Sequence, residues 1–123
     1  MTKTEITKIV NRWEESRLLE GLTTKKQKTE CALLLDSITC YLLGTLRTPS
    51  KITKKEQYYV DSLIPITRRL YSEGIKNIEP ELLYNNYVKF LNNKPKLSNK
   101  IKDKEAELVA IFCDNMIEEF NNK

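Results

Sequence analysis

The sequence contains no histidine, the side chain that most often acts as a general base or a metal ligand. Nucleophilic pairs of serine or cysteine with histidine are therefore excluded. Carboxylate pairs remain, such as Asp114 and Glu118, which are four residues apart on one face of a predicted helix. Because such pairs are ordinary on solvated helices, we predict that the protein is not an enzyme.

The cysteines and glycines also lack the spacing of a metal or cofactor site. No CxxC pair occurs, and Cys31 and Cys40 point to opposite sides of one predicted helix because they are nine residues apart. The three glycines are too far apart to form a phosphate-binding loop. We therefore predict no catalytic residues, no metal site and no cofactor. The three cysteines, which include Cys113, are interpreted as small buried residues in a reducing compartment.

Short runs of lysine and arginine are the remaining candidates for a binding site. The net charge is +4, and such side chains bind a phosphate backbone in a salt-dependent, sequence-independent way. Tyrosines on the same predicted helices could stack on bases. The alternative is an ordinary solvated helix surface, because neighbouring acidic residues dilute several of the runs. The candidate nucleic-acid contacts are Lys25, Lys26, Lys28, Lys54 and Lys55.

Charge is unevenly distributed along the chain. Residues 1–104 contain 20 lysines and arginines against 12 acidic residues, and five of these lysines lie within residues 94–104. Residues 105–123 contain one lysine against five acidic residues. One surface could therefore attract polyanions while another repels them. The alternative is two solvated helix faces of opposite sign.

Start and stop signals divide the chain into five predicted helices. A threonine followed three residues later by glutamate or glutamine is the pattern of a capping box, and it occurs at Thr2, Thr24 and Thr53. Glycines that favour the end of a helix follow at Gly21, Gly44 and Gly74. With the helical spacing of apolar residues, these signals predict helices over residues 3–20, 25–43, 54–72, 80–91 and 98–120.

Three of these helices carry features that constrain their packing. Pro65 lies inside helix 54–72, where it removes a backbone donor and clashes with the preceding turn, so we expect a kink. Helix 25–43 is apolar around most of its circumference, which indicates that neighbouring helices or partner subunits enclose it. Helix 98–120 is expected to bury Ile101 and Phe120. Segments 47–52 and 92–96 are predicted loops.

These elements predict an all-α fold, a compact bundle of about five helices in a single domain over residues 1–123. With 40% apolar residues, only three glycines and four prolines, the composition disfavours both disorder and a sandwich of short strands. The first residues lack the apolar region of a signal peptide, and no run of about 18 apolar residues occurs. We therefore expect an intracellular protein that does not interact with a membrane.

Three short motifs suggest a family. Residues 9–22 (IVNRWEESRLLEGL) combine a Trp-Glu pair with a Leu-Leu-Glu-Gly-Leu run, and residues 32–37 (ALLLDS) form an apolar segment. Residues 63–71 (LIPITRRLY) contain proline followed by paired arginines and tyrosine. In order and approximate spacing, residues 5–71 resemble the N-terminal segment of the major capsid proteins of T4-like tailed phages. In that family a long α/β body that builds the shell follows these segments, and this sequence has no such body.

The resemblance implies a shortened relative of those capsid proteins, or an accessory virion protein that docks on capsid, neck or packaging components. It would place the protein in the host cytoplasm or in the virion. The alternative is that the tryptophan and leucines belong to the core and that the arginines are solvated. The residues that the resemblance implies as partner contacts are Trp13, Leu18, Leu19, Arg68 and Arg69.

Two functions fit this sequence. The first is a non-enzymatic assembly or adaptor protein that packs its helices against partner subunits, as a homo-oligomer or as a component of a phage virion. The alternative is an accessory protein that binds nucleic acid through its lysine- and arginine-rich helix faces.

Overall fold

The computed structural model describes residues 1–44 and 53–122. These residues form five α-helices and no strand, which confirms the predicted all-α fold. The loop predicted over residues 47–52 lies outside the described residues. The helices are α1 (Lys3–Glu15), α2 (Lys25–Leu43), α3 (Lys54–Ser72), α4 (Pro80–Asn92) and α5 (Lys104–Asn121).

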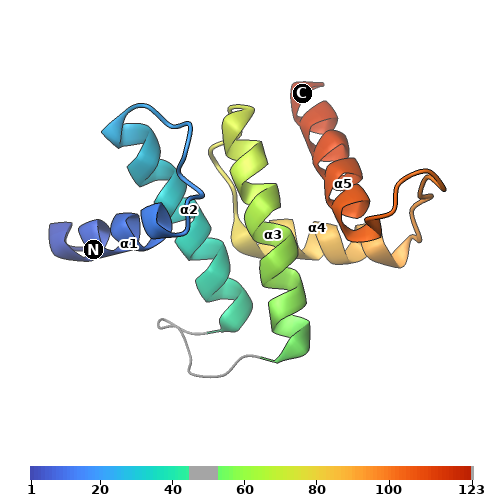
Figure 1. Ribbon diagram of the computed structural model, residues 1–123, viewed down its shortest axis with the longest axis horizontal. Helices are drawn as coiled ribbons and strands as arrows, with labels where there is room; N and C mark the ends of the chain where they lie inside the picture. Colours follow the sequence, from blue (N-terminus) through green and yellow to red (C-terminus); the bar gives the residue numbers. More distant parts are fainter. Residues whose placement is uncertain (45–52, 123) are drawn as a thin grey trace.

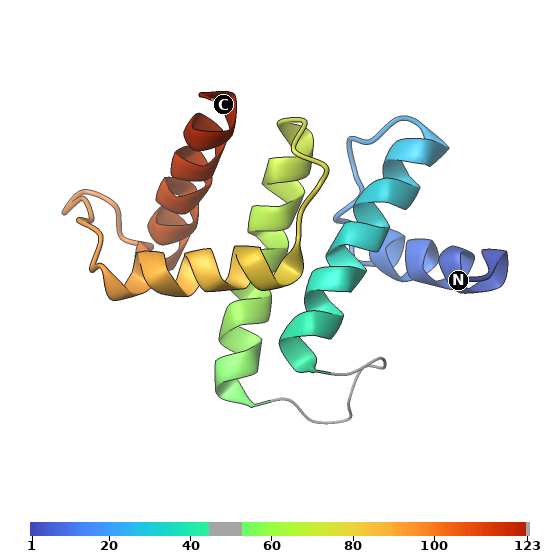
Figure 2. The ribbon, with the colours of Figure 1, turned by 180° about the vertical axis from the view of Figure 1, so that it is seen from behind.

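Helices α2, α3 and α5 lie in a row with α3 in the middle (Figure 1). α2 runs antiparallel to α3, and α5 runs in the same direction as α3. α4 crosses the other side of this row, as the view from behind shows (Figure 2), and contacts α2. α1 lies across α2 and projects from the row, so α1 and α5 are on opposite sides of the α2–α3 pair. None of the described helices is long and apolar enough to cross a membrane.

Threonine caps set the starts of three helices. The hydroxyls of Thr24 and Thr53 each accept the N–H of the residue three positions later at 3.1 Å, and the side chain at that position accepts the threonine N–H in return. Thr2 accepts the N–H of Glu5 at the start of α1. Such bonds satisfy N–H groups that have no partner within the helix, and so the sequence signal and the observed starts agree.

Two predicted helix bounds were wrong. α1 ends at Glu15 rather than at residue 20, because Arg17 adopts a φ of 69° and residues 16–21 form turns. Gly21 therefore lies in this connection and not at a helix end. α5 begins at Lys104 rather than at residue 98. Its N-cap is Asp103, whose carboxylate accepts the N–H of Ala106 at 3.1 Å. Residues 98–103 instead belong to the loop that follows α4.

The end of α3 is fixed by its glycine. The N–H of Ile75 donates to the carbonyl of Leu70, and the N–H of Gly74 donates to the carbonyl of Tyr71, both at 3.0 Å. This pair of bonds forms a Schellman motif, which requires the left-handed conformation that Gly74 adopts at a φ of 88°. The motif turns Ile75 back into the core, where it is buried.

α3 is one continuous helix from Lys54 to Ser72, so Pro65 does not break it, and the predicted kink is not confirmed. Pro65 lies on the exposed side of the helix. The carbonyl of Asp61, which loses its helical donor at this proline, can therefore bind water instead.

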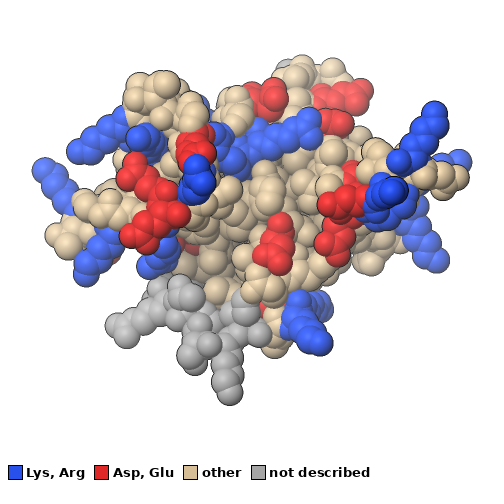
Figure 3. All heavy atoms as spheres, in the orientation of Figure 1, with Lys and Arg blue, Asp and Glu red and all other residues tan. Residues whose placement is uncertain are grey.

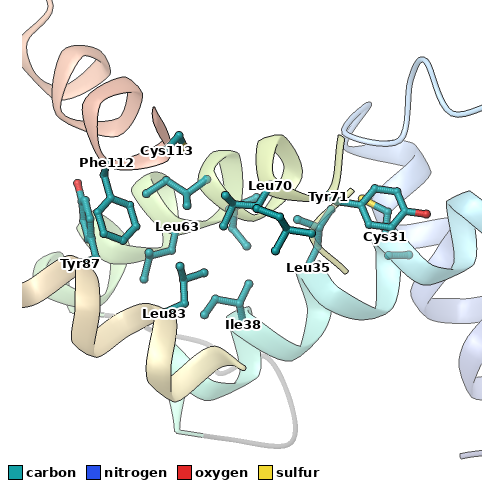
Figure 4. Close-up of a cluster of buried hydrophobic side chains, with 14 of the residues drawn as sticks. Cys31, Leu35, Ile38, Leu63, Leu70, Tyr71, Leu83, Tyr87, Phe112 and Cys113 are labelled. Atoms are coloured by element: carbon teal, nitrogen blue, oxygen red, sulfur yellow. The ribbon is translucent and has the colours of Figure 1, made fainter. Parts of the chain in front are cut away.

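The hydrophobic core lies where α3 meets its neighbours (Figure 4). Leu35 and Ile38 of α2 and Leu63 of α3 are fully buried there. Tyr87 of α4 and Phe112 of α5 close the core on the other side, with ring centroids 5.1 Å apart. α2 contacts α1, α3 and α4, which explains why its sequence is apolar around most of its circumference.

Candidate partner-binding surface

Helix α1 packs across α2 without burying any of its 13 residues. Its apolar stripe, Ile6, Ile9, Val10 and Trp13, is only half-buried, and Ile6 does not reach the core cluster. The indole N–H of Trp13 is buried without a hydrogen-bond partner among the described residues. An amphipathic helix whose apolar stripe is partly covered leaves apolar area that a partner can bury.

A groove of about 360 Å³ lies between α1 and the first turns of α2. Ile6 and Val10 supply its apolar lining, and Lys25 and Lys28 line it from α2. Such a groove forms because α1 crosses α2 instead of running alongside it (Figure 1). Its volume is at the small end of the range for binding pockets, roughly 300–1,000 Å³, and suits one large apolar side chain. The other lining residues are Thr7, Asn11, Glu14 and Thr29.

The α2 side of this groove is positively charged. α2 begins with Lys25, Lys26 and Lys28 and has no acidic residue in its first turn. The Nζ of Lys28 lies 3.4 Å from a carboxylate oxygen of Glu14, whereas Lys25 has no ion pair within residues 1–44 and 53–122. The N-terminus of a helix is itself partially positive, so these lysines add to its potential and do not balance it. The groove therefore favours an acidic partner.

The hydrophobic residues that were predicted to contact a partner differ in their burial. Trp13 and Leu18 are half-buried and packed against the core. Leu19 is 2% exposed and belongs to the core itself, so its side chain is not on the surface of the folded chain. Sequence reasoning identified the spacing of Ile6 and Val10, but it treated them only as packing residues and missed the groove they line.

Arg68 fastens the α1–α2 connection to α3. Its Nε donates to the carbonyl of Leu18 at 2.8 Å, and its Nη2 donates to the carbonyl of Glu20 at 3.0 Å. Its Nη1 donates to the hydroxyl of Ser72 on its own helix. A planar guanidinium can hold several acceptors at once, so Arg68 acts as a clamp between segments about 50 residues apart.

Arg69 points to the other side of α3 and fastens α5. Its guanidinium donates to the Asp114 carboxylate, and the hydrogen bond and charge of that carboxylate raise the pKa of Arg69 further above its usual value. Its Nη1 also lies 3.4 Å from the carbonyl of Ala110. Both arginines predicted as partner contacts are therefore engaged within the chain.

The predicted nucleic-acid contacts do not form one patch. Lys25, Lys26 and Lys28 lie at the start of α2, while Lys54 and Lys55 lie at the start of α3. Because the two helices run antiparallel, these clusters are at opposite ends of the pair, separated by about the length of a 19-residue helix, roughly 28 Å. A continuous phosphate track over all five lysines is therefore absent from the described surface.

Lys54 and Lys55 also differ in their surroundings. Lys54 lines a groove between α3 and α5 that contains Asp61, Asp103 and Glu105, which oppose phosphate binding. Lys55 lines a cavity of about 310 Å³ that Glu56 also lines, together with tyrosines that contact one another edge to face. These tyrosines are Tyr41, Tyr59 and Tyr84.

The carboxylates between α3 and α5 already serve the helices that carry them. Asp103 caps α5, and Asp61 accepts a hydrogen bond of 2.6 Å from Gln57 one turn earlier on α3. Within the part of the chain that the structure describes, no three cysteine or acidic residues are grouped so that they could hold a metal ion.

Two residues expected to be buried by the last helix are on the surface instead. Ile101 is 46% exposed, because it lies in the loop before α5. Phe120 is 50% exposed at the end of α5. The loop between α4 and α5, which contains Ile101, also carries exposed lysines. They contribute to the positive charge at the right-hand edge of the molecule in Figure 3. These are Lys94, Lys96, Lys100 and Lys102.

The cysteines are free thiols that the fold makes unreactive to different extents. Cys31 and Cys113 are fully buried, as predicted, whereas Cys40 is half-buried beside Asp36. Burial raises the pKa of Cys31 and raises that of Cys113 to about 11. Because the thiolate is the reactive form, Cys31 and Cys113 behave as core residues.

The chain matches no family model, no curated protein sequence and no solved structure. The resemblance of residues 5–71 to phage capsid proteins therefore stays a prediction.

Proposed function

We propose that the protein is a non-enzymatic assembly or adaptor protein that binds partner subunits through the groove between α1 and α2. The observation that carries this proposal is that α1 has a regular apolar stripe and yet buries none of its residues. A helix of 13 residues is too short to be stable alone in water, so its position depends on packing. A partner that covers Ile6 and Val10 would complete that packing.

The resemblance of residues 5–71 supports one setting for this activity. A component of a tailed-phage virion would bind capsid or neck subunits, and it would be present in the host cytoplasm before assembly. Such a protein needs surfaces for helix packing and no reactive side chain. The groove at α1 lies within the segment that carries the resemblance, since its lining residues all fall within residues 5–71.

Ile6→Asp tests the proposal, because Ile6 lines the groove without belonging to the core cluster. We expect the wild-type chain to form species heavier than 14.4 kDa, or to co-sediment with purified capsids of T4-like phages. The variant should stay folded and lose this association, because a buried carboxylate is costly. Light scattering and sedimentation measure the masses. A wild-type chain that is monomeric and does not bind capsids would contradict the proposal.

Nucleic-acid binding is the second candidate function, and the cavity beside Lys55 favours it. Tyr41 is 40% exposed, and the centroid of its ring lies 6.0 Å from that of Tyr84. Its ring offers a stacking surface in the cavity that Lys55 lines. The lysines of the α4–α5 loop add sequence-independent attraction for phosphate. In this case affinity for single-stranded nucleic acid should fall steeply between low and moderate salt. Tyr41→Ala should weaken it, while Ile6→Asp should not.

A further inference from the structure

We propose that the groove between α1 and α2 receives the C-terminal end of α5 from a second copy of this chain. This inference rests on the proposed function, because it names the partner of the same surface. The contact would join the α1 side of one copy to the α5 side of the next, so the copies would associate head to tail.

The end of α5 carries an apolar stripe that its own chain leaves uncovered. Phe112, Met116 and Phe120 are four residues apart and therefore follow one face of the helix. Exposure rises along this stripe from 3% at Phe112, through half-buried Met116, to 50% at Phe120. α4 crosses near the beginning of α5 and leaves its last turns free (Figures 1 and 2). The last turns thus present an aromatic side chain to another surface.

The groove has the size and lining that such a side chain requires. Its volume of about 360 Å³ accommodates one aromatic ring, and Ile6 and Val10 provide apolar contacts for the ring faces. Thr7 and Asn11 supply polar groups among the other lining residues. An aromatic residue seated in an apolar pocket with polar surroundings is the usual form of an energetic anchor at a protein interface.

Charge selects the partner. Residues 105–122 contain five acidic residues and no lysine or arginine. Glu118 and Glu119 directly precede Phe120 and form no ion pair within the described residues. They would face Lys25 and the positive end of α2 when Phe120 enters the groove. The same charges disfavour pairing of α5 with another α5, because two identical acidic helix ends repel each other.

The arrangement of the helices prevents the chain from filling its own groove, since α1 and α5 lie on opposite sides of the α2–α3 pair (Figure 1). When the two surfaces lie on opposite sides of the molecule, a head-to-tail contact between them can continue from copy to copy. One anchor in a small groove falls below the roughly 1,200–2,000 Å² of a stable interface. We therefore expect association that is weak and that increases with protein concentration.

The first experiment removes the anchor. We expect the average mass of the full chain, measured by light scattering and sedimentation velocity, to rise with concentration. Phe120→Ala should weaken this self-association by roughly tenfold or more, as for other truncated aromatic anchors. Leu82→Ala is the matched control, because Leu82 is 56% exposed on α4 and lies outside the groove and the α5 stripe. Its association constant should equal that of the wild type.

The second experiment reverses the charges. Lys25→Glu should weaken self-association several-fold. In the triple variant that adds Glu118→Lys and Glu119→Lys, the loss should be smaller than the sum of the losses of Lys25→Glu and of Glu118→Lys with Glu119→Lys, because the exchanged charges attract each other although Lys26, Lys28 and the end of α2 stay positive. Lys89→Glu makes the same change in net charge on α4, away from the groove, and should have little effect. Circular dichroism verifies that each variant remains helical.

Three outcomes would overturn the inference: a wild-type chain that is monomeric at every concentration, association unaffected by Phe120→Ala, or losses in the triple variant that simply add. The Ile6→Asp variant separates this failure from that of the proposed function. If Ile6→Asp abolishes association and Phe120→Ala does not, the groove binds a different segment and the proposed function survives. If neither substitution changes association or capsid binding, both proposals are wrong.

Discussion

At the scale of single residues, the side chains that could take part in chemistry make structural contacts instead. Arg68 and Arg69 bind carbonyl and carboxylate oxygens of neighbouring segments, and Asp103 caps a helix. Cys113 is fully buried, and its pKa is raised to about 11 because the fold desolvates the thiolate. These contacts explain why residues that looked available in the sequence are not free to react.

Cys113 should make the free energy of unfolding depend on alkaline pH. Its folded pKa of about 11 lies above its ordinary value of 9.0, so the fold favours the neutral thiol. This stability is present in full below pH 9 and is lost as pH rises toward 11, by about 2 kcal/mol at pH 10.5. Urea unfolding at pH 7.5 and 10.5 should show this loss reduced in Cys113→Ala. An identical pH dependence in the variant would contradict the assigned burial.

At the scale of the helices, local hydrogen bonds decide where each element begins and ends. Thr24 and Thr53 form reciprocal capping boxes, and Gly74 completes a Schellman motif. Where the local signal was weaker, the predicted bounds failed. α1 ends five residues early because Arg17 takes a left-handed conformation, which no pattern of apolar residues reveals.

Thr24→Ala should reduce the free energy of unfolding by about 1 kcal/mol, the usual cost of losing an N-terminal cap. The cause is that the N–H of Gln27 loses the hydroxyl to which it donates at 3.1 Å. Thr24→Ser retains a hydroxyl and should stay close to the wild type. Urea denaturation followed by circular dichroism compares the three proteins, and equal midpoints for the alanine and serine variants would argue against the capping box.

At the scale of the whole molecule, α3 organises the fold by holding a different neighbour on each side. Arg68 reaches the α1–α2 connection, and the next residue, Arg69, reaches α5. The groove at α1 is therefore positioned by a side chain from the centre of the row. This dependence links the proposed partner surface to the core.

Arg68→Ala should lower stability by about 1–3 kcal/mol, because the carbonyls of Leu18 and Glu20 lose a charged donor. Besides lowering the stability of the whole fold, the substitution should loosen the segment that Arg68 holds. Amide hydrogen exchange of residues 3–22 should become faster relative to that of α5. Arg68→Lys keeps the charge but cannot hold both carbonyls in the same geometry, so it should give an intermediate effect. Unchanged exchange in residues 3–22 would show that Arg68 is not a clamp.

The sequence by itself determined the helical class, the full extent of α2 and α3, and the burial of Cys31 and Cys113. These features depend on interactions within a few residues of the chain and on apolar spacing, both of which can be read along it. The exposure of Ile101 and Phe120 could not be read in this way. Their helical spacing matches that of core residues, and only the length of the neighbouring elements decides whether anything covers them.

Tertiary structure alone decided which charges and apolar stripes meet. The antiparallel arrangement of α2 and α3 places the two lysine clusters at opposite ends, and the crossing of α1 over α2 creates the groove. Arg68 and Arg69, adjacent in sequence, serve opposite sides of α3. The physical reason is that these contacts join residues of different helices, whose proximity depends on how whole helices pack and not on any local preference.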